Sequence, residues 1–130
     1  MDAGVHSVTI GPLGLHGALR MPMRARGLVI FAHGSGSSRL SPRNTHVAQV
    51  LGSHRLATLL FDLLTAEEAQ SRDNVFDIPL LAQRLEQAVA VADADDGLRA
   101  LPLGLFGAST GAAAPRVAAA RRGERVLSVG

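Results

Sequence analysis

The sequence predicts an α/β fold in which a mostly parallel sheet carries helices on both faces. Three short apolar runs, at 27–32 (GLVIFA), 56–61 (LATLLF) and 101–106 (LPLGLF), have the length and composition of strands buried on both faces. A segment with a helical pattern follows each run before the next strand begins. Strands that alternate with helices form parallel sheets, because each helix carries the chain back along the sheet.

Two of the helices are predicted by start signals and helical spacing. Ser41 and Pro42 are typical of an N-cap and the first helical residue, and this helix is expected to run to about Ser53. The second helix is expected from Phe76 to about Ala92. Their expected buried faces carry Val47, Val50 and Leu51 in the first helix and Ile78, Leu81, Leu85, Ala88 and Ala92 in the second. Arg84, Glu86 and Gln87 are expected to point away from the second face.

The remaining elements are indicated by turn residues and by alternation. Asp93–Gly97 should stop the second helix. Thr65–Asn74 is polar and is interpreted as a loop or a short capping turn. The other expected elements are a hairpin of strands Val5–Ile10 and Leu15–Met21 around the turn Gly11–Gly14, a Gly/Ser loop at His33–Ser38, a helix at Ala112–Arg121 and a strand at Val126–Val129.

The composition excludes several classes of protein. The 13 basic residues are scattered, and the net charge is only +2, so no nucleic-acid-binding surface is expected. The absence of cysteine excludes disulfides, thiol catalysis and cysteine-based zinc sites. No apolar run of about 18 residues is present, so no membrane span is expected. With no signal peptide visible at the N-terminus, we expect a cytoplasmic protein.

A serine between glycines marks the candidate catalytic site. Gly107-Ala108-Ser109-Thr110-Gly111 matches G-x-S-x-G directly after a predicted strand and before a predicted helix. In that setting Ser109 is the candidate nucleophile, and the backbone N–H of Thr110 is one donor to the oxyanion. The second donor is expected from the loop after an earlier strand, where His33-Gly34-Ser35-Gly36 makes the N–H of Ser35 the best candidate. The supporting loop residues are His33, Gly34, Gly36, Gly107 and Gly111.

These loops have two other interpretations. The first is a structural Gly-Ser turn with no catalytic role. The second is phosphate binding, since both loops are expected to open helices. The sequence has no G-x-G-x-x-G, and it has no lysine to complete a Walker motif. The pairing of HGSG with G-x-S-x-G therefore favours nucleophilic catalysis.

The motifs together resemble the α/β-hydrolase superfamily, and most of all its bacterial dienelactone-hydrolase-like branch. The resembling segments are GLVIFAHGSGSSRLSPRN (27–44), LATLLFDLLTAEE (56–68) and GLFGASTGAAA (104–114). Similar domains also occur fused to phosphoribosyltransferase domains. The resemblance implies a serine hydrolase of ester, lactone or thioester carbonyls that needs no metal or cofactor. It also implies that Asp62 organises a loop, because the family's catalytic acid normally comes later in the chain.

The family's triad is incomplete in this sequence. The order in this fold is Ser, then Asp or Glu, then His. After Ser109 the sequence holds one carboxylate, Glu124, and no histidine. Residues 1–130 are therefore expected to form a single incomplete domain, the N-terminal two-thirds of an α/β-hydrolase fold, with the acid and histidine outside it. The alternatives are a non-catalytic remnant and a module that folds with a partner. The strand at Val126–Val129 would then be an exposed edge that invites self-association.

Overall fold

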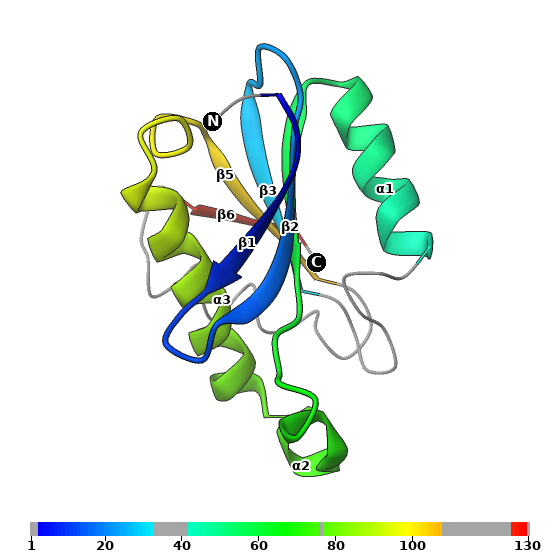
Figure 1. The fold of residues 1–130 in the computed structure, drawn as a ribbon, viewed down its shortest axis with the longest axis vertical. Helices are drawn as coiled ribbons and strands as arrows, with labels where there is room; N and C mark the ends of the chain where they lie inside the picture. The colour runs from blue at the N-terminus through cyan, green and yellow to red at the C-terminus, as the bar shows by residue number, and fades with distance from the viewer. Residues whose placement is uncertain (1–2, 33–41, 76, 108–125, 130) are drawn as a thin grey trace.

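The described residues of the computed structural model, 3–32, 42–75, 77–107 and 126–129, form a six-stranded sheet between helices (Figure 1). The strand order is β1-β2-β4-β3-β5-β6. Strands β3 to β6 run parallel to one another, and β2 pairs antiparallel with both β1 and β4. The mostly parallel sheet is therefore confirmed. The strands are β1 Gly4–Ile10, β2 Leu15–Met21, β3 Gly27–Ala32, β4 Leu56–Phe61, β5 Leu103–Gly107 and β6 Val126–Val129.

The N-terminal hairpin adds the two antiparallel strands at one side of the sheet. Its turn is closed by the Gly14 N–H, which donates to the Gly11 carbonyl over 3.1 Å. Gly11 has a φ of +70°, and a Cβ there would collide with the side chain of Gln87. The left-handed φ favours glycine here, and any larger residue would also have to displace the flexible end of the Gln87 side chain.

Helices cover both faces of the sheet, as predicted. Helix α1 (Pro42–Ser53) and helix α3 (Ile78–Ala94) lie on opposite sides of it in Figure 1. The face under α3 carries the larger core, which includes Leu28, Leu59 and Leu105 of the sheet. The face under α1 holds a smaller cluster of Phe31, Ala48 and Leu60. Along β3 and β4, side chains alternate between these two clusters, as the pleat requires.

The buried face of α1 differs by one residue from the expectation. Val47 and Leu51 pack against the sheet as predicted. Val50 is 45% exposed, and Ala48 is buried instead. The reason is geometric: residues 47, 48 and 51 share one face of a helix, and residue 50 lies beside it. The predicted N-cap, Ser41, lies outside the described residues.

Arg84 corrects the prediction for α3. It was expected to point away from the apolar face, but only 6% of it is exposed. Position 84 follows Leu81 by three residues and precedes Ala88 by four, so it belongs to the stripe that faces the sheet. Glu86 and Gln87, also expected to point away, are half-buried.

The two ends of α3 are set by aspartate side chains. Asp77 is the N-cap of α3, with its carboxylate accepting the Leu80 N–H over 3.1 Å. At the other end Asp95 accepts the N–H groups of Gly97 and Leu98, which confirms a stop within Asp93–Gly97. Strand β5 begins at Leu103, two residues later than predicted. The predicted helix Ala112–Arg121 and Phe76 lie outside the described residues.

Candidate active site

Strands β3 and β5 end side by side, and the two candidate catalytic loops begin at these ends. The parallel register pairs Phe31 with Phe106 and then Ala32 with Gly107, the last residues of the two strands. The HGSG segment follows Ala32 directly, and Gly107 is the first residue of G-x-S-x-G. Ligands of parallel sheets bind beyond this carboxyl edge. The sheet therefore brings together the start of both predicted loops.

Most of the predicted site residues lie outside the residues that the structure describes. Gly107 is described and lies in β5 as expected. The nucleophile Ser109, the oxyanion donors Ser35 and Thr110, and the supporting residues lie outside the described residues. Those supporting residues are His33, Gly34, Gly36 and Gly111. Glu124, the carboxylate that follows Ser109, also lies outside them.

An aromatic pair joins the two strands just before the loops. The rings of Phe31 and Phe106 are tilted by 46°, with their centroids 5.4 Å apart. Both residues belong to the smaller cluster under α1, where Phe31 is only 2% exposed. Tilted aromatic contacts of this kind stabilise a pair by about 1 kcal/mol beyond the burial of their area. The pair therefore reinforces the β3–β5 register at the position from which both loops depart.

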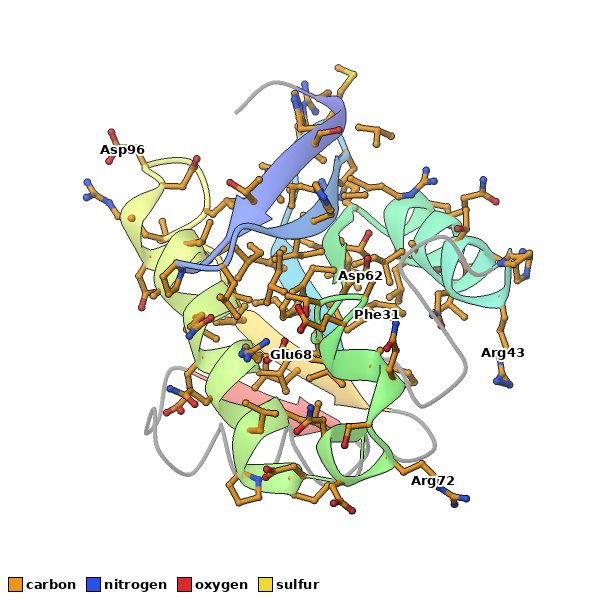
Figure 2. All side chains as sticks on the ribbon, turned by 60° about the horizontal axis from the view of Figure 1, so that its bottom comes forward. Phe31, Arg43, Asp62, Glu68, Arg72 and Asp96 are labelled. Atoms are coloured by element: carbon orange, nitrogen blue, oxygen red, sulfur yellow. The ribbon has the colours of Figure 1, made fainter. Side chains whose placement is uncertain are left out.

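An ion pair between a buried arginine and a half-buried glutamate lies beyond the end of β4, at the same edge of the sheet. Arg84 makes a two-pronged contact with Glu68: its Nη1 donates to Oε1 over 2.8 Å and its Nη2 to Oε2 over 2.7 Å. Nη1 also donates to the Leu63 carbonyl over 3.0 Å. Figure 2 turns this edge towards the viewer and labels Glu68, together with Asp62 and Phe31. Sequence reasoning missed this pair, although an arginine inside an apolar helical stripe could have revealed it.

Glu68 also closes a short turn with Thr65. The Thr65 N–H donates to Glu68 Oε1 over 3.0 Å, and the Glu68 N–H donates to Thr65 Oγ1 over 3.1 Å. This reciprocal arrangement is a capping box. It starts the 3₁₀ helix η1 (Glu68–Gln70), and helix α2 (Arg72–Val75) follows. The predicted capping turn is therefore present at Thr65–Glu68, but the rest of Thr65–Asn74 forms η1 and the start of α2, which were not predicted.

The ion pair changes the acidity of both partners in the direction that favours the charged forms. The hydrogen bonds from the Arg84 guanidinium, and then the Thr65 N–H, lower the pKa of Glu68 to about 2. Partial burial opposes this change but is outweighed. The same hydrogen bond to Glu68 raises the pKa of Arg84. Both side chains therefore stay ionised at any pH at which an ester hydrolase would be assayed.

Asp62 is the first residue after β4. Its N–H donates to the His16 carbonyl of β2 over 3.0 Å, which extends the pairing of these strands by one bond. The residue is half-buried, and Figure 2 shows its side chain at the carboxyl edge. Its predicted part in organising a loop stays a prediction.

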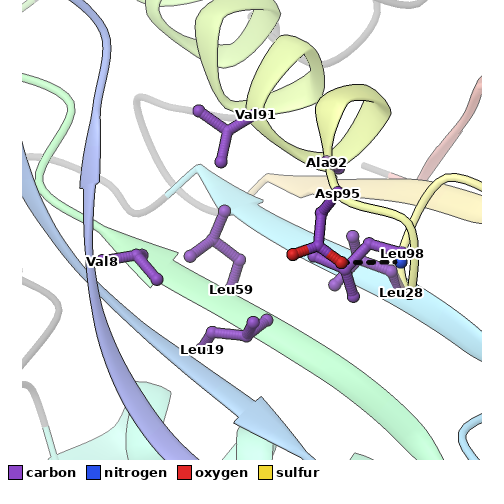
Figure 3. Close-up of a pocket in the computed structure, with 8 residues that line it drawn as sticks. All are labelled: Val8, Leu19, Leu28, Leu59, Val91, Ala92, Asp95 and Leu98. Atoms are coloured by element: carbon purple, nitrogen blue, oxygen red, sulfur yellow. Dashed lines mark hydrogen bonds between the residues drawn. The ribbon is translucent and has the colours of Figure 1, made fainter. Parts of the chain in front are cut away.

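The cavity in Figure 3 is unsuitable for substrate. It lies between α3 and the sheet towards the amino ends of the strands, away from the candidate loops. Its volume is about 30 Å³, whereas ligand pockets typically measure ~300–1,000 Å³. The lining is almost entirely apolar, apart from the Asp95 carboxylate that caps α3. The lining residues are Val8, Leu19, Leu28, Leu59, Val91, Ala92, Asp95 and Leu98.

Two kinds of site are absent from the part of the chain that the structure describes. There, no three His, Cys, Asp or Glu side chains gather closely enough to hold a metal ion. Among the helices of those ranges, none is long and apolar enough to cross a membrane.

A parallel sheet with a G-x-S-x-G segment after one strand and HGSG after its neighbour defines the α/β-hydrolase class. The comparisons agree. A crystal structure of a dienelactone hydrolase from Anabaena variabilis superposes with a TM-score of 0.86 at 50% identity, over 96% of this chain and 60% of that one. A carboxyl esterase from Bacillus coagulans shares the fold at 17% identity, with a TM-score of 0.72 over 98% of this chain and 44% of that one. The chain belongs to the α/β-hydrolase superfamily.

Curated relatives come from Mycobacterium tuberculosis. Proteins from two strains, each named "Putative phosphoribosyl transferase", are 55% identical to this chain over 113 residues. That match covers 87% of this chain but 26% of the relatives, so the chain spans about a quarter of their length. No family model matches the chain.

Proposed function

We propose that the chain contributes the nucleophile and oxyanion hole of a serine hydrolase that acts on an ester, lactone or thioester carbonyl. The observation that carries this proposal is the β3–β5 register, which starts the HGSG and G-x-S-x-G loops from neighbouring strand ends. Two backbone donors for one oxyanion must converge on a single oxygen, and adjacent strand ends make this geometry accessible. The 50% identity to a dienelactone hydrolase supports the same chemistry.

In the proposed reaction Ser109 Oγ attacks the carbonyl carbon while a general base takes the hydroxyl proton. The N–H groups of Ser35 and Thr110 hold the tetrahedral oxyanion. Collapse of this intermediate expels the alcohol or thiol, which takes the proton back, and leaves Ser109 acylated. Water then releases the acid by the same route. The base and its acid partner are expected in the part of the relatives that residues 1–130 do not span. The site needs no metal or cofactor.

Phosphoribosyl transfer is not the activity that we propose for this segment. The relatives with that name are about four times as long as the matched region. The matched region instead carries the serine motif and the hydrolase fold. We also propose a cytoplasmic location, a small-molecule substrate, and self-association of isolated residues 1–130 through β6, which is at one edge of the described sheet. Neither nucleic acid nor membrane is a proposed partner.

Covalent labelling tests the proposal in the full-length protein. A fluorophosphonate should add one phosphonyl group to Ser109, located by mass spectrometry, and the protein should hydrolyse p-nitrophenyl acetate. Ser109→Ala should abolish both, whereas Ser71→Ala, an exposed serine at the end of η1, should change neither. Residues 1–130 alone should react at least about a hundredfold more slowly, because the base is missing. Ester hydrolysis that survives in Ser109→Ala would refute the nucleophile assignment.

A further inference from the structure

We propose that Glu68 and Arg84 form a positioning pair for the proposed hydrolytic site, fixing the segment Leu63–Glu68 as one wall of the substrate pocket. The inference rests on the proposed function, because the pair acts on substrate through this segment and does not touch the reacting atoms. Three features support it: the position of the segment at the edge of the sheet, the hydrogen bonds that hold it, and the burial of an arginine that makes them.

The segment leaves the sheet beside the end of β3. Strand β4 pairs in parallel with β3, and their carboxyl ends lie at the same edge. The segment after β4 therefore begins next to the strand end from which the sequence continues to the proposed oxyanion donor Ser35. Figure 1 shows α2, which continues from this segment, projecting beyond that edge of the sheet. A wall in this position would face the acyl or alcohol portion of a bound ester.

One guanidinium holds both ends of the segment. Arg84 binds the Leu63 carbonyl at the start and the Glu68 carboxylate at the end. The capping box between Thr65 and Glu68 fixes the residues between them. In addition, the Asn74 side chain donates to the Glu68 carbonyl over 3.1 Å. The path of Leu63–Glu68 is thus set by polar contacts with defined geometry as well as by apolar packing.

If position 84 only had to fill space, an apolar side chain would serve better than an arginine. Leu81, Leu85 and Ala88 of the same stripe are buried apolar residues, and a methionine could replace the arginine in volume. Buried ion pairs are frequently no more stable than such apolar replacements, because desolvation offsets the attraction. They do impose a unique geometry, since the two-pronged contact is satisfied in one arrangement. A segment that lines a substrate pocket needs such a fixed position.

A positioning role predicts a change in specificity that a purely structural role does not. With the wall loosened, long substrates should lose binding energy, whereas a small reagent that meets only Ser109 should not. Glu68→Gln keeps the shape of the side chain but removes the charge. Arg84→Lys keeps the charge and loses the fork, so it provides a milder variant that should fold even if Glu68→Gln does not. The matched control is Asp96→Asn, which breaks the exposed pair between Asp96 and Arg99, 3.2 Å apart.

The experiment uses the full-length protein and p-nitrophenyl esters from acetate to octanoate, together with fluorophosphonate labelling of Ser109. In Glu68→Gln we expect KM for octanoate to rise about tenfold while kcat for acetate and the labelling rate change less than about threefold. Arg84→Lys should shift KM in the same direction by less, and Asp96→Asn should match the wild type. Folded variants with an unaltered KM profile, alongside a wild type that labels at Ser109, would overturn the positioning role alone. A wild type that neither labels nor hydrolyses would overturn the proposed function and this inference with it.

Discussion

Arg84 and Thr58 are the buried polar side chains of the described core. They differ in whether their polar atoms have hydrogen-bond partners. Arg84 faces the sheet from α3, and its guanidinium binds a carboxylate and a carbonyl. Thr58 of β4 is fully buried on the opposite face, beneath α1, and within the described residues its hydroxyl has no hydrogen-bond partner. Its cross-strand partner on β2 is Arg20, whose Nε is also buried and unpartnered there.

The contrast shows that the cost of burying an unpaired polar group depends strongly on its charge. An unpaired hydroxyl in an apolar setting costs about 1–3 kcal/mol, which a domain can tolerate. An unpaired guanidinium would cost several times more, so Arg84 can be buried only where Glu68 meets it.

The largest expected effect comes from removing the charge that is fully paired. Arg84→Met leaves Glu68 without its cation and the Leu63 carbonyl without its donor. We expect the free energy of unfolding to fall by about 3 kcal/mol, measured by urea titration at pH 7. Adding Glu68→Met to this variant should restore part of the loss, because no isolated charge is left. If the free energy of unfolding of Arg84→Met lies within 1 kcal/mol of the wild-type value, the pair is not important to stability.

Acid should break the same pair without any mutation. The pKa of Glu68 is about 2 in the folded protein and near 4.5 in the unfolded chain, so the unfolded state binds the proton more tightly. The stabilisation is fully present above pH 4.5 and is lost as the pH falls towards 2. On the order of 2 kcal/mol should disappear over this interval. Urea titrations across it should show the loss in the wild type and a shallower dependence in Glu68→Gln, and parallel curves would contradict the assignment.

Thr58 should respond in the opposite direction. Thr58→Val removes the unpartnered hydroxyl and keeps the branched shape, so the free energy of unfolding should rise by about 0.5–1 kcal/mol. Thermal unfolding followed by circular dichroism provides the measurement. A loss of stability would show that the hydroxyl has a partner in solution, such as a bound water molecule.

The smallest effect is expected at the far end of α3. Asp96 and Arg99 form an exposed pair, with their side chains 90% and 62% exposed. Exposed pairs three residues apart typically contribute about 0.3 kcal/mol. Asp96→Asn should therefore leave the urea midpoint almost unchanged. A loss comparable to that of Arg84→Met would refute the view that burial separates the two ion pairs.

Much of the fold could be predicted because the signals are local. Strands β2, β3 and β4 match their predicted bounds, since apolar composition and flanking turns define them within a few residues. Arg84 was misplaced because a charged residue was assumed to face solvent, although its spacing placed it on the buried stripe. Leu101 was assigned to β5, but its N–H donates to the Leu98 carbonyl and closes a turn instead.

The site could be predicted only in part, for a different physical reason. The position of Gly107 at the end of β5 follows from a motif at a strand terminus, which is local. The pairing of Glu68 with Arg84 joins residues sixteen positions apart, and its geometry depends on how α3 packs on the sheet. Nothing in the sequence around Glu68 alone indicates that partner. Ser109 remains an expectation that the labelling experiment addresses, and the oxyanion donors Ser35 and Thr110 remain predictions.

The pinned segment also has a consequence for how this domain can change in length. Arg84 is hydrogen-bonded to both residue 63 and residue 68, so the number of residues between them is fixed. An insertion there must break one of these contacts. The exposed stretch 71–73 is held less tightly, since the described contact that spans it is a single hydrogen bond from the Asn74 side chain to the Glu68 carbonyl. Extra residues that reshape substrate choice, whether acquired naturally or grafted by design, should be accepted there and rejected between Leu63 and Glu68. Arg84 would thus separate a segment at the edge of the site whose length is fixed from one whose length can vary.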